Sequence, residues 1–197
     1  TGDSTPRLAG TAEPGASVEI AVDGVVVATV TADAAGQWFY VPSAPLADGA
    51  HTVSVTATDA NGNTATDTST FTVDTSLPSL SIVAPGDGTT TSERRPVVSG
   101  TADPGALVVV IVDGVMVGTA TADADGSWSI PLGMDLADGP HSVTATTTNA
   151  AGNTATETND FSVDSTAPTV TITTPPDGSV IATQTPAITG TAEAGAT

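Results

Sequence analysis

The sequence has no cysteine and no lysine, and these two absences already exclude several classes of protein. Without cysteine, the chain has no disulfide framework, no thiolate nucleophile and no cysteine-ligated zinc. Its three arginines are too few to build the basic face of a nucleic-acid-binding protein. The longest apolar run, residues 106–112, is far shorter than the ~20 residues that span a bilayer. We therefore expect no nucleic-acid partner and no membrane insertion in this segment.

Aromatic residues are also scarce, at 3%, so any hydrophobic core must consist mainly of aliphatic side chains. Such side chains are available, because 39% of the residues are hydrophobic and only 13% are charged. This balance favours a folded chain over an intrinsically disordered one. The 22 acidic residues give a formal net charge of −19, which makes cations natural partners and anionic lipids or heparin unsuitable ones.

A repeat with a period of 90 residues is the most informative feature of the sequence. The segment GTAEPGA, which starts at Gly10, returns as GTADPGA at Gly100 and as GTAEAGA at Gly190. The same offset pairs Trp38 with Trp128, and the copies align without any insertion or deletion. We interpret the chain as a tandem array of units of about 90 residues, a normal size for one small domain.

The boundaries between units are predicted at two proline-containing segments, residues 73–78 and 163–168. A proline cannot donate a ladder hydrogen bond, and it holds the preceding residue extended. We predict that residues 1–75 are a first repeat lacking its first strand and that residues 76–165 are a complete second repeat. Residues 166–197 would be the first strands of a truncated third repeat. Because no signal peptide is present and the outer repeats are partial, we expect an excerpt or a processed product.

Hydrophobic alternation predicts β-strands throughout, since no apolar pattern of helical period occurs. In the second repeat we predict seven strands, over residues 80–84, 96–101, 106–112, 115–122, 127–131, 141–148 and 154–163. Threonine and valine, which favour strands, dominate these segments, and Asp-Gly pairs supply the turns between them. We therefore predict an all-β chain of tandem immunoglobulin-like sandwiches. Trp38 and Trp128 are expected in the cores and Phe39 on the surface.

The order of motifs within each unit resembles that of a known family. GTA(E/D)PGA is followed by TAD-x-x-G-x-W, then LADG-x-H-x-V, then GNTAT and finally VD-x-x-x-P. This series resembles bacterial immunoglobulin-like repeats, which build the stalks of large surface adhesins and other secreted multidomain proteins. The resemblance covers the whole chain. It implies an extracellular rod at the cell surface, neighbouring repeats as partners and often Ca²⁺ at the joints, but it names no ligand.

The two histidines, His51 and His141, occupy equivalent positions just after an Asp-Gly pair. A catalytic pair is rarely duplicated at identical positions of tandem domains, and no nucleophile stands at a recognisable spacing. We predict that both histidines are structural and that the chain is not an enzyme.

Carboxylates are expected to gather at the joints between repeats. If the strands alternate up and down, several acidic loop residues lie at the ends where two repeats meet. They are Asp23, Asp48, Asp74 and Asp103 at the first joint, and Asp138, Asp164 and Glu193 at the second. Ca²⁺ accepts six to eight oxygen ligands in loose geometry, so we predict Ca²⁺ sites there. The alternative is a set of solvated aspartates in turns, where their side chains bond the backbone.

One strand of the second repeat carries a further candidate site. Leu107, Val109 and Ile111 replace a serine, a glutamate and an alanine of the first repeat. If the intervening valines form the core, these three side chains face outward. Such an apolar stripe predicts a lateral contact, although a neighbouring strand or loop of the same repeat could cover it.

Two classes of function remain open at this point. The first is a passive extracellular spacer, a rod of sandwiches in series. The second is an assembly or binding module, either a filament subunit or a holder of glycan or another surface ligand. In the filament, residues 169–174 would be donated to the first repeat of a second copy, although residues 186–190 duplicate a strand that the acceptor already has. The scarcity of exposed aromatics argues against a sugar platform. We favour the spacer.

Overall fold

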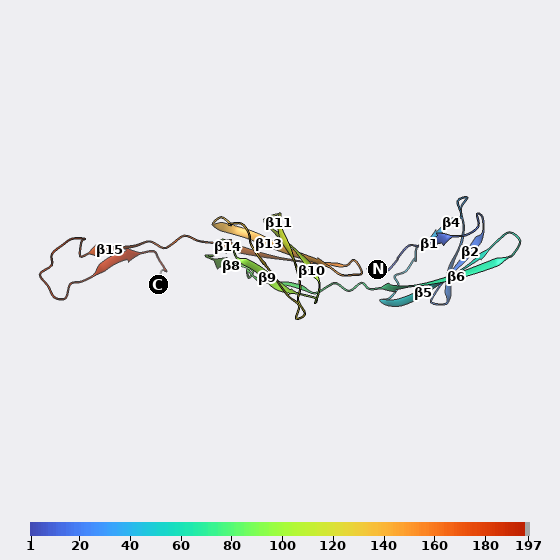
Figure 1. Ribbon diagram of the computed structural model, residues 1–197, viewed down its shortest axis with the longest axis horizontal. Coiled ribbons are helices and arrows are strands. Elements are labelled where there is room, and N and C mark those ends of the chain that lie inside the picture. Colours follow the sequence, from blue (N-terminus) through green and yellow to red (C-terminus); the bar gives the residue numbers. More distant parts are fainter. Residues whose placement is uncertain (196–197) are drawn as a thin grey trace.

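The computed structural model describes residues 1–195, and every regular element within them is a β-strand. The first repeat contains β1 (Leu8–Thr11), β2 (Ser17–Val22), β3 (Val25–Thr31), β4 (Gln37–Tyr40), β5 (Gly49–Thr58) and β6 (Thr64–Val73). The second contains β7 (Leu80–Ala84), β8 (Thr89–Thr91), β9 (Val97–Ala102), β10 (Leu107–Val112), β11 (Val115–Thr121), β12 (Ser127–Pro131), β13 (Gly139–Thr148) and β14 (Thr154–Val163). The third contains β15 (Val170–Thr174) and β16 (Thr189–Ala192). Figure 1 shows these three parts in a row along the longest axis.

Each of the first two repeats is a pair of sheets that face one another. In the first repeat, the sheets have the orders β3-β2-β5-β6 and β1-β4. In the second repeat, the orders are β11-β10-β13-β14-β8 and β12-β9-β7. β15 and β16 form a separate two-stranded sheet. The predicted all-β fold of tandem immunoglobulin-like sandwiches is confirmed.

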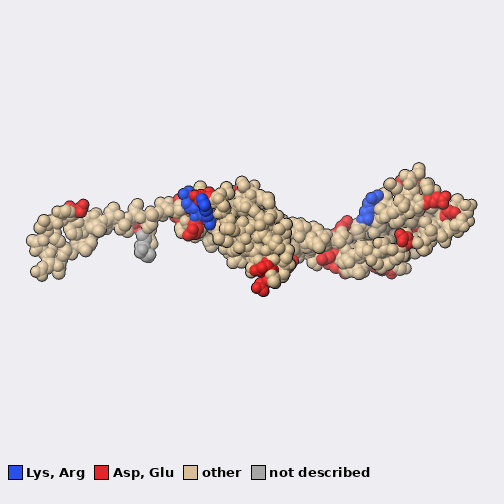
Figure 2. All heavy atoms as spheres, viewed as in Figure 1, with Lys and Arg blue, Asp and Glu red and all other residues tan. Residues whose placement is uncertain are grey.

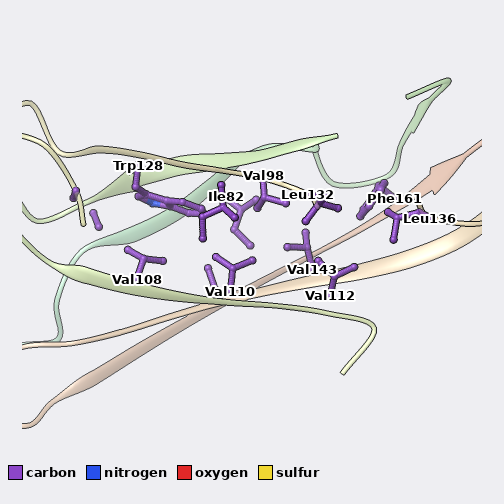
Figure 3. Close-up of a cluster of buried hydrophobic side chains, with 14 of the residues drawn as sticks. Ile82, Val98, Val108, Val110, Val112, Trp128, Leu132, Leu136, Val143 and Phe161 are labelled. Carbon is purple, nitrogen blue, oxygen red and sulfur yellow. The ribbon is translucent and has the colours of Figure 1, made fainter. Parts of the chain in front are cut away.

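The core of the second repeat is aliphatic, as the composition requires. Val108, Val110 and Val143 are fully buried between the two sheets, and Trp128 lies against them with 3% of its surface exposed. Figure 3 shows these side chains in one continuous layer. Trp38 is buried in the first repeat, whereas Phe39 is exposed, with the Arg7 guanidinium 4.5 Å from the centre of its ring. The predicted positions of both tryptophans and of Phe39 are therefore confirmed.

The second repeat has one strand that the sequence analysis did not predict. After β7, the chain crosses to the other sheet, where β8 pairs in parallel with β14. The buried amide of Asn159 on β14 holds this crossing by donating to the Ile82 carbonyl (3.3 Å) and the Pro85 carbonyl (3.1 Å). β8 was missed because it has only three residues, all threonines, in a segment rich in turn residues. The first strand of the fold therefore contributes to both sheets.

Candidate functional site

The first joint is built on a short extended linker, residues 74–79. Its first residues are held by acidic side chains of the first repeat. Asp48 accepts hydrogen bonds from the Thr75 backbone N–H (2.9 Å) and from the Thr75 hydroxyl (2.9 Å). Asp74 accepts one from the Ser76 N–H (3.0 Å), and the Ser76 hydroxyl and N–H lower the pKa of Asp74. Both carboxylates thus fix the direction in which the chain leaves β6.

Two asparagines of the second repeat hold the same linker from the other side. The Asn153 amide donates to the carbonyls of Asp74 (2.6 Å) and Ser76 (3.0 Å), and the Asn149 amide donates to that of Ser76 (2.9 Å). Both asparagines lie in the turn between β13 and β14. We call these three contacts the amide clamp. The acceptors of these three hydrogen bonds are backbone carbonyls of the linker. The amide clamp therefore holds the linker against the second repeat independently of the linker's side chains.

The two repeats also touch directly beside the linker. The Gly2 backbone N–H of the first repeat donates to the Ala151 carbonyl of the second at 2.7 Å. A Cβ atom at Gly2 would lie 2.1 Å from the Asn153 side-chain oxygen, so a larger residue there would require the Asn153 side chain to shift. The β13–β14 turn is therefore packed between the linker and the first repeat.

The end of the linker and the second joint use the same chemistry. At the end of the first linker, Ser79 donates to Asp103 through its N–H (3.1 Å) and its hydroxyl. At the second joint, Asp138 accepts from the Ser165 hydroxyl (2.6 Å), and the Ser165 hydroxyl and N–H lower the pKa of Asp138. Asp164 accepts from the Thr166 N–H at 3.1 Å. The start of the linker is thus held in the same way at both joints.

The remaining predicted joint ligands have other partners. The Asp23 carboxylate contacts His51 Nδ1 at 2.7 Å, while the Ala47 carbonyl lies 2.7 Å from Nε2. Both partners are acceptors, so the two contacts favour the doubly protonated, positively charged imidazole, in which both ring nitrogens donate. The Ala47 carbonyl and the Asp23 carboxylate accordingly raise the pKa of His51. Glu193 lies beyond β16, where its backbone N–H donates to the Thr169 carbonyl at 3.1 Å.

The second repeat reproduces this histidine contact. His141 Nδ1 lies 2.7 Å from the Asp113 carboxylate, and Nε2 lies 2.8 Å from the Ala137 carbonyl. Burial lowers the pKa of His141, but the two acceptors outweigh it and leave the pKa raised. We call the pairs Asp23–His51 and Asp113–His141 the Asp–His clamps. Each pair links the turn of one hairpin to β5 or β13. The structural role of the two histidines stays a prediction.

Calcium fits the first joint poorly in this arrangement. Asp48, Asp74 and Asp103 already accept hydrogen bonds from the linker, and the amide clamp occupies two linker carbonyls that could otherwise bind a cation. Within residues 1–195, no three acidic or histidine side chains converge as a metal-binding group. The predicted Ca²⁺ sites stay a prediction.

The apolar stripe of β10 lies on the outer face of its sheet. Val108, Val110 and Val112 point into the core, so the alternate residues point away from it. Leu107 is 54% exposed, whereas Val109 and Ile111 are half-buried between β11 and β13. The predicted lateral contact stays a prediction.

Charge is concentrated in small groups on the molecule. Figure 2 shows acidic groups mostly at loops and joints, basic groups at two places and uncharged surface over most of both sandwiches. One basic group includes the exposed ion pair of Arg95 with Asp135. No helix long and apolar enough to cross a membrane is found among residues 1–195.

The amide clamp and the Asp–His clamps were missed by the sequence analysis. Both involve polar residues that are ordinary in turns. The available signal was the recurrence of Asn63 as Asn153 and of the Asp–His pair in two repeats at a constant offset. Recurrence showed that the positions matter, but it could not show which groups they contact.

Comparisons with known proteins agree with this architecture. A family model described as a bacterial Ig-like domain matches residues 1–75 and 83–165. The chain is similar to a tetra-tandem repeat from the extending region of a large adhesion protein, with 29% identity and a TM-score of 0.39 over 86% of this chain and 48% of that chain. It is similar to a Ca²⁺-stabilized adhesin of an Antarctic bacterium, with 31% identity and a TM-score of 0.42 over 87% and 47% of the two chains.

A third solved structure supports the fold alone. It contains fibronectin(III)-like modules of Clostridium thermocellum CbhA, with 16% identity and a TM-score of 0.52 over 81% of this chain and 86% of that chain. The chain spans about half the length of the two adhesin chains, at 48% and 47%. Among curated proteins, none matches the chain.

Proposed function

Because the chain belongs to the bacterial Ig-like domain family, we propose that it forms non-catalytic spacer repeats of an extracellular, adhesin-like bacterial surface protein. In this function the repeats hold another part of the protein at a distance from the cell. The family membership supports an architecture of repeated domains, and the joints support the spacing role.

The observation that carries this proposal is the amide clamp. A spacer transmits distance only if its joints resist bending, and the linker here is held from both sides. Asp48 holds it to the first repeat, and Asn149 and Asn153 hold it to the second. Hydrogen bonds of this kind contribute about 1 kcal/mol each, so several together strongly bias the joint toward one angle.

Replacement of both clamp asparagines tests the proposal. In the Asn149→Ala/Asn153→Ala double variant, we expect a shorter mean end-to-end distance and a broader distribution of distances by small-angle X-ray scattering extrapolated to zero concentration. Asn63→Ala is the matched control. It changes the equivalent turn of the first repeat, where the amide donates to Asp59, and leaves the joint intact. If the double variant and the control scatter as the wild type does, the clamp does not set the joint angle.

The sequence also leads us to propose that Ca²⁺ stiffens the joints between repeats. Small-angle X-ray scattering tests this as well. Scattering is recorded in 2 mM Ca²⁺ and in EDTA. If the direct hydrogen bonds set the joint, the wild-type chain has the same dimensions in both solutions. A chain that lengthens and melts at a higher temperature in Ca²⁺ would instead support the predicted joint ions, since a ligand that binds the folded state stabilises it.

End-to-end assembly by donation of residues 169–174 is the alternative that the sequence leaves open, and no contact among the described residues favours it. The spacer proposal does not depend on this, because the amide clamp acts within one chain. Binding of a glycan on a sheet face has less support, because Phe39 is the one exposed aromatic ring described and Arg7 already covers one face of it.

A further inference from the structure

The loop that holds the start of the first linker has little support from its own backbone. Ala47 and Asp48 lie between β4 and β5, belong to no strand and are exposed. The preceding residue, Leu46, donates its N–H to the Ser4 carbonyl at 2.8 Å. Within residues 1–195, no backbone–backbone hydrogen bond outside the strands involves Ala47 or Asp48. Exposed loops of this kind open at low cost, so the Asp48 carboxylate needs another support.

His51 supplies a contact at the right place in this loop. Its Nε2 lies 2.7 Å from the Ala47 carbonyl oxygen. The peptide unit between Ala47 and Asp48 is planar, so a fixed carbonyl also fixes the direction in which Asp48 begins. The Asp48 carboxylate then accepts from Thr75 of the linker, from its N–H at 2.9 Å and from its hydroxyl at 2.9 and 3.0 Å. One peptide unit therefore separates the imidazole contact from the residue that binds the linker.

The other side of the imidazole is anchored in the folded sandwich. Nδ1 lies 2.7 Å from one oxygen of the Asp23 carboxylate, and the other oxygen accepts from the Thr52 N–H at 2.8 Å. His51 is only 9% exposed, and the centre of the Phe71 ring lies 5.6 Å from the centre of the imidazole. Because the ring is held on this side, the exposed loop must adapt to the ring.

The second repeat contains the same series of contacts. His141 Nε2 lies 2.8 Å from the Ala137 carbonyl oxygen. The next residue, Asp138, accepts from Ser165 of the second linker through its N–H (3.1 Å) and its hydroxyl (2.6 Å). The Phe161 ring packs against His141 with its centre 5.7 Å away. Both linkers are thus held by an aspartate whose preceding carbonyl faces a buried histidine.

We propose that His51 and His141 are positioning residues for the joints. Each imidazole holds the carbonyl that precedes Asp48 or Asp138 and thereby aims that carboxylate at the start of the linker. The turn between β2 and β3 is in this way connected to the first linker, although no strand joins them. The proposal rests on the spacer function, because it states what holds the linker on the side of the first repeat. Without the His51 contact, the amide clamp alone holds the first linker in place.

Two substitutions of His51 separate its contact with Ala47 from its contact with Asp23. A glutamine amide reaches the position of Nε2, so His51→Gln keeps a donor toward Ala47. An asparagine amide reaches the position of Nδ1, so His51→Asn keeps a donor toward Asp23 instead. His51→Gln should lose at least as much stability in thermal unfolding, because the contact that it lacks is with a charged group. We nevertheless expect only His51→Asn to loosen the joint, whereas a histidine that served stability alone would make the joint follow the stability.

The joint is measured by pulsed electron paramagnetic resonance between spin labels at Thr29→Cys and Thr119→Cys. The chain has no cysteine, so the labels attach at these two positions alone, which are exposed and equivalent on β3 and β11. We expect one narrow distance distribution for the wild type and for His51→Gln, and a broader one for His51→Asn. His141→Asn is the matched control. It removes the contact that serves the second linker and should leave the distances across the first joint unchanged.

Two further measurements do not depend on the label distances or on a histidine variant. Hydrogen exchange of the Thr75 N–H, followed by nuclear magnetic resonance, should be about threefold faster in His51→Asn than in the wild type and unchanged in His51→Gln, as expected for one exposed hydrogen bond. Asp48→Ala removes the carboxylate from the exposed loop and should broaden the distances as His51→Asn does. The two substitutions together should broaden them no further, because both act on the same contact.

The proposal is overturned if His51→Asn keeps the wild-type distances and the wild-type exchange of Thr75. It is also overturned if His51→Gln loosens the joint equally, if His141→Asn loosens it, or if the effects of Asp48→Ala and His51→Asn add. The spacer function is decided separately by the Asn149→Ala/Asn153→Ala variant. If that variant loosens the joint and His51→Asn does not, the spacer function stands and the positioning role fails. If neither variant loosens it, both proposals fail.

Discussion

Replacement of Gly100 by alanine is expected to lower the free energy of unfolding of the second repeat by about 3 kcal/mol or more. The added Cβ atom would lie 1.8 Å from the Ser81 carbonyl oxygen and 2.6 Å from the Trp128 ring. A flexible side chain could move aside, but the first neighbour is backbone and the second is a buried ring. β7 must therefore leave β9, which would expose the core residue Ile82. Thermal or urea unfolding followed by tryptophan fluorescence measures the loss.

The matched control for this substitution is Gly133→Ala. Gly133 has no atom within 4 Å of its Cβ position and does not adopt a positive φ, so a methyl group meets no obstacle there. We expect a change within about 0.5 kcal/mol, as for most surface substitutions. Equal stability of the two variants would contradict the close approach of β7 to β9.

Replacement of His141 by alanine is expected to cost about 1.5–3 kcal/mol at pH 6, the range for hydrogen bonds to charged groups. The pKa of His141 is raised in the folded chain. Its contribution to the free energy of unfolding is therefore complete below the unfolded-state pKa of 6.5, and it is lost as the pH rises through the folded-state pKa. The pKa of its partner Asp113 is lowered in the folded chain. The stabilisation by the Asp113 carboxylate is therefore fully present above the unfolded-state pKa of 3.8, and it is lost as the pH falls through the folded-state pKa. The Asp113–His141 clamp is therefore strongest between these two pH values.

The measurement is the unfolding free energy of the wild type and the variant at pH 6 and pH 9. The chain has no cysteine, so the histidines are the side chains that change charge in this interval. The difference between the two proteins should shrink at pH 9. Val143→Ala, which removes fully buried core atoms and no titratable group, should lose the same stability at both values. A His141→Ala deficit that is equal at pH 6 and pH 9 would mean that the charge of the imidazole contributes nothing.

The sequence predicts the sandwich because the information for it is local. Alternation in the LVVVIV segment of β10 places Val108, Val110 and Val112 on one face, and the turn glycines delimit the strands. The 90-residue period then transfers each assignment from one repeat to the other. β8 was missed because its three threonines carry no alternation, and its pairing with β14 depends on residues about 70 positions away.

The candidate site was harder to predict, because its residues act through neighbours that only the folded chain brings together. Asp48, Asp74 and Asp138 were predicted as joint ligands for a cation, and in the structure their partners are linker N–H and hydroxyl groups. The charge of a carboxylate suggests a cation, and nothing local shows that a backbone donor already satisfies it. Asn149 and Asn153 are common turn residues, so their donation to the linker could not be inferred from type or spacing.

The crossing of the first strand from one sheet to the other gives the second repeat a particular response to pulling. Tension on a rod enters this repeat before β7 and leaves after β14. Because β8 and β14 run parallel, the load slides one strand along the other, and the hydrogen bonds between residues 89–91 and 161–163 must fail together rather than one at a time. The Asn159 amide ties the preceding bend to β14 and shares the load. Since forced unfolding is governed by the rate of unfolding, this short strand protects a stretched array more than its small contribution to equilibrium stability would indicate.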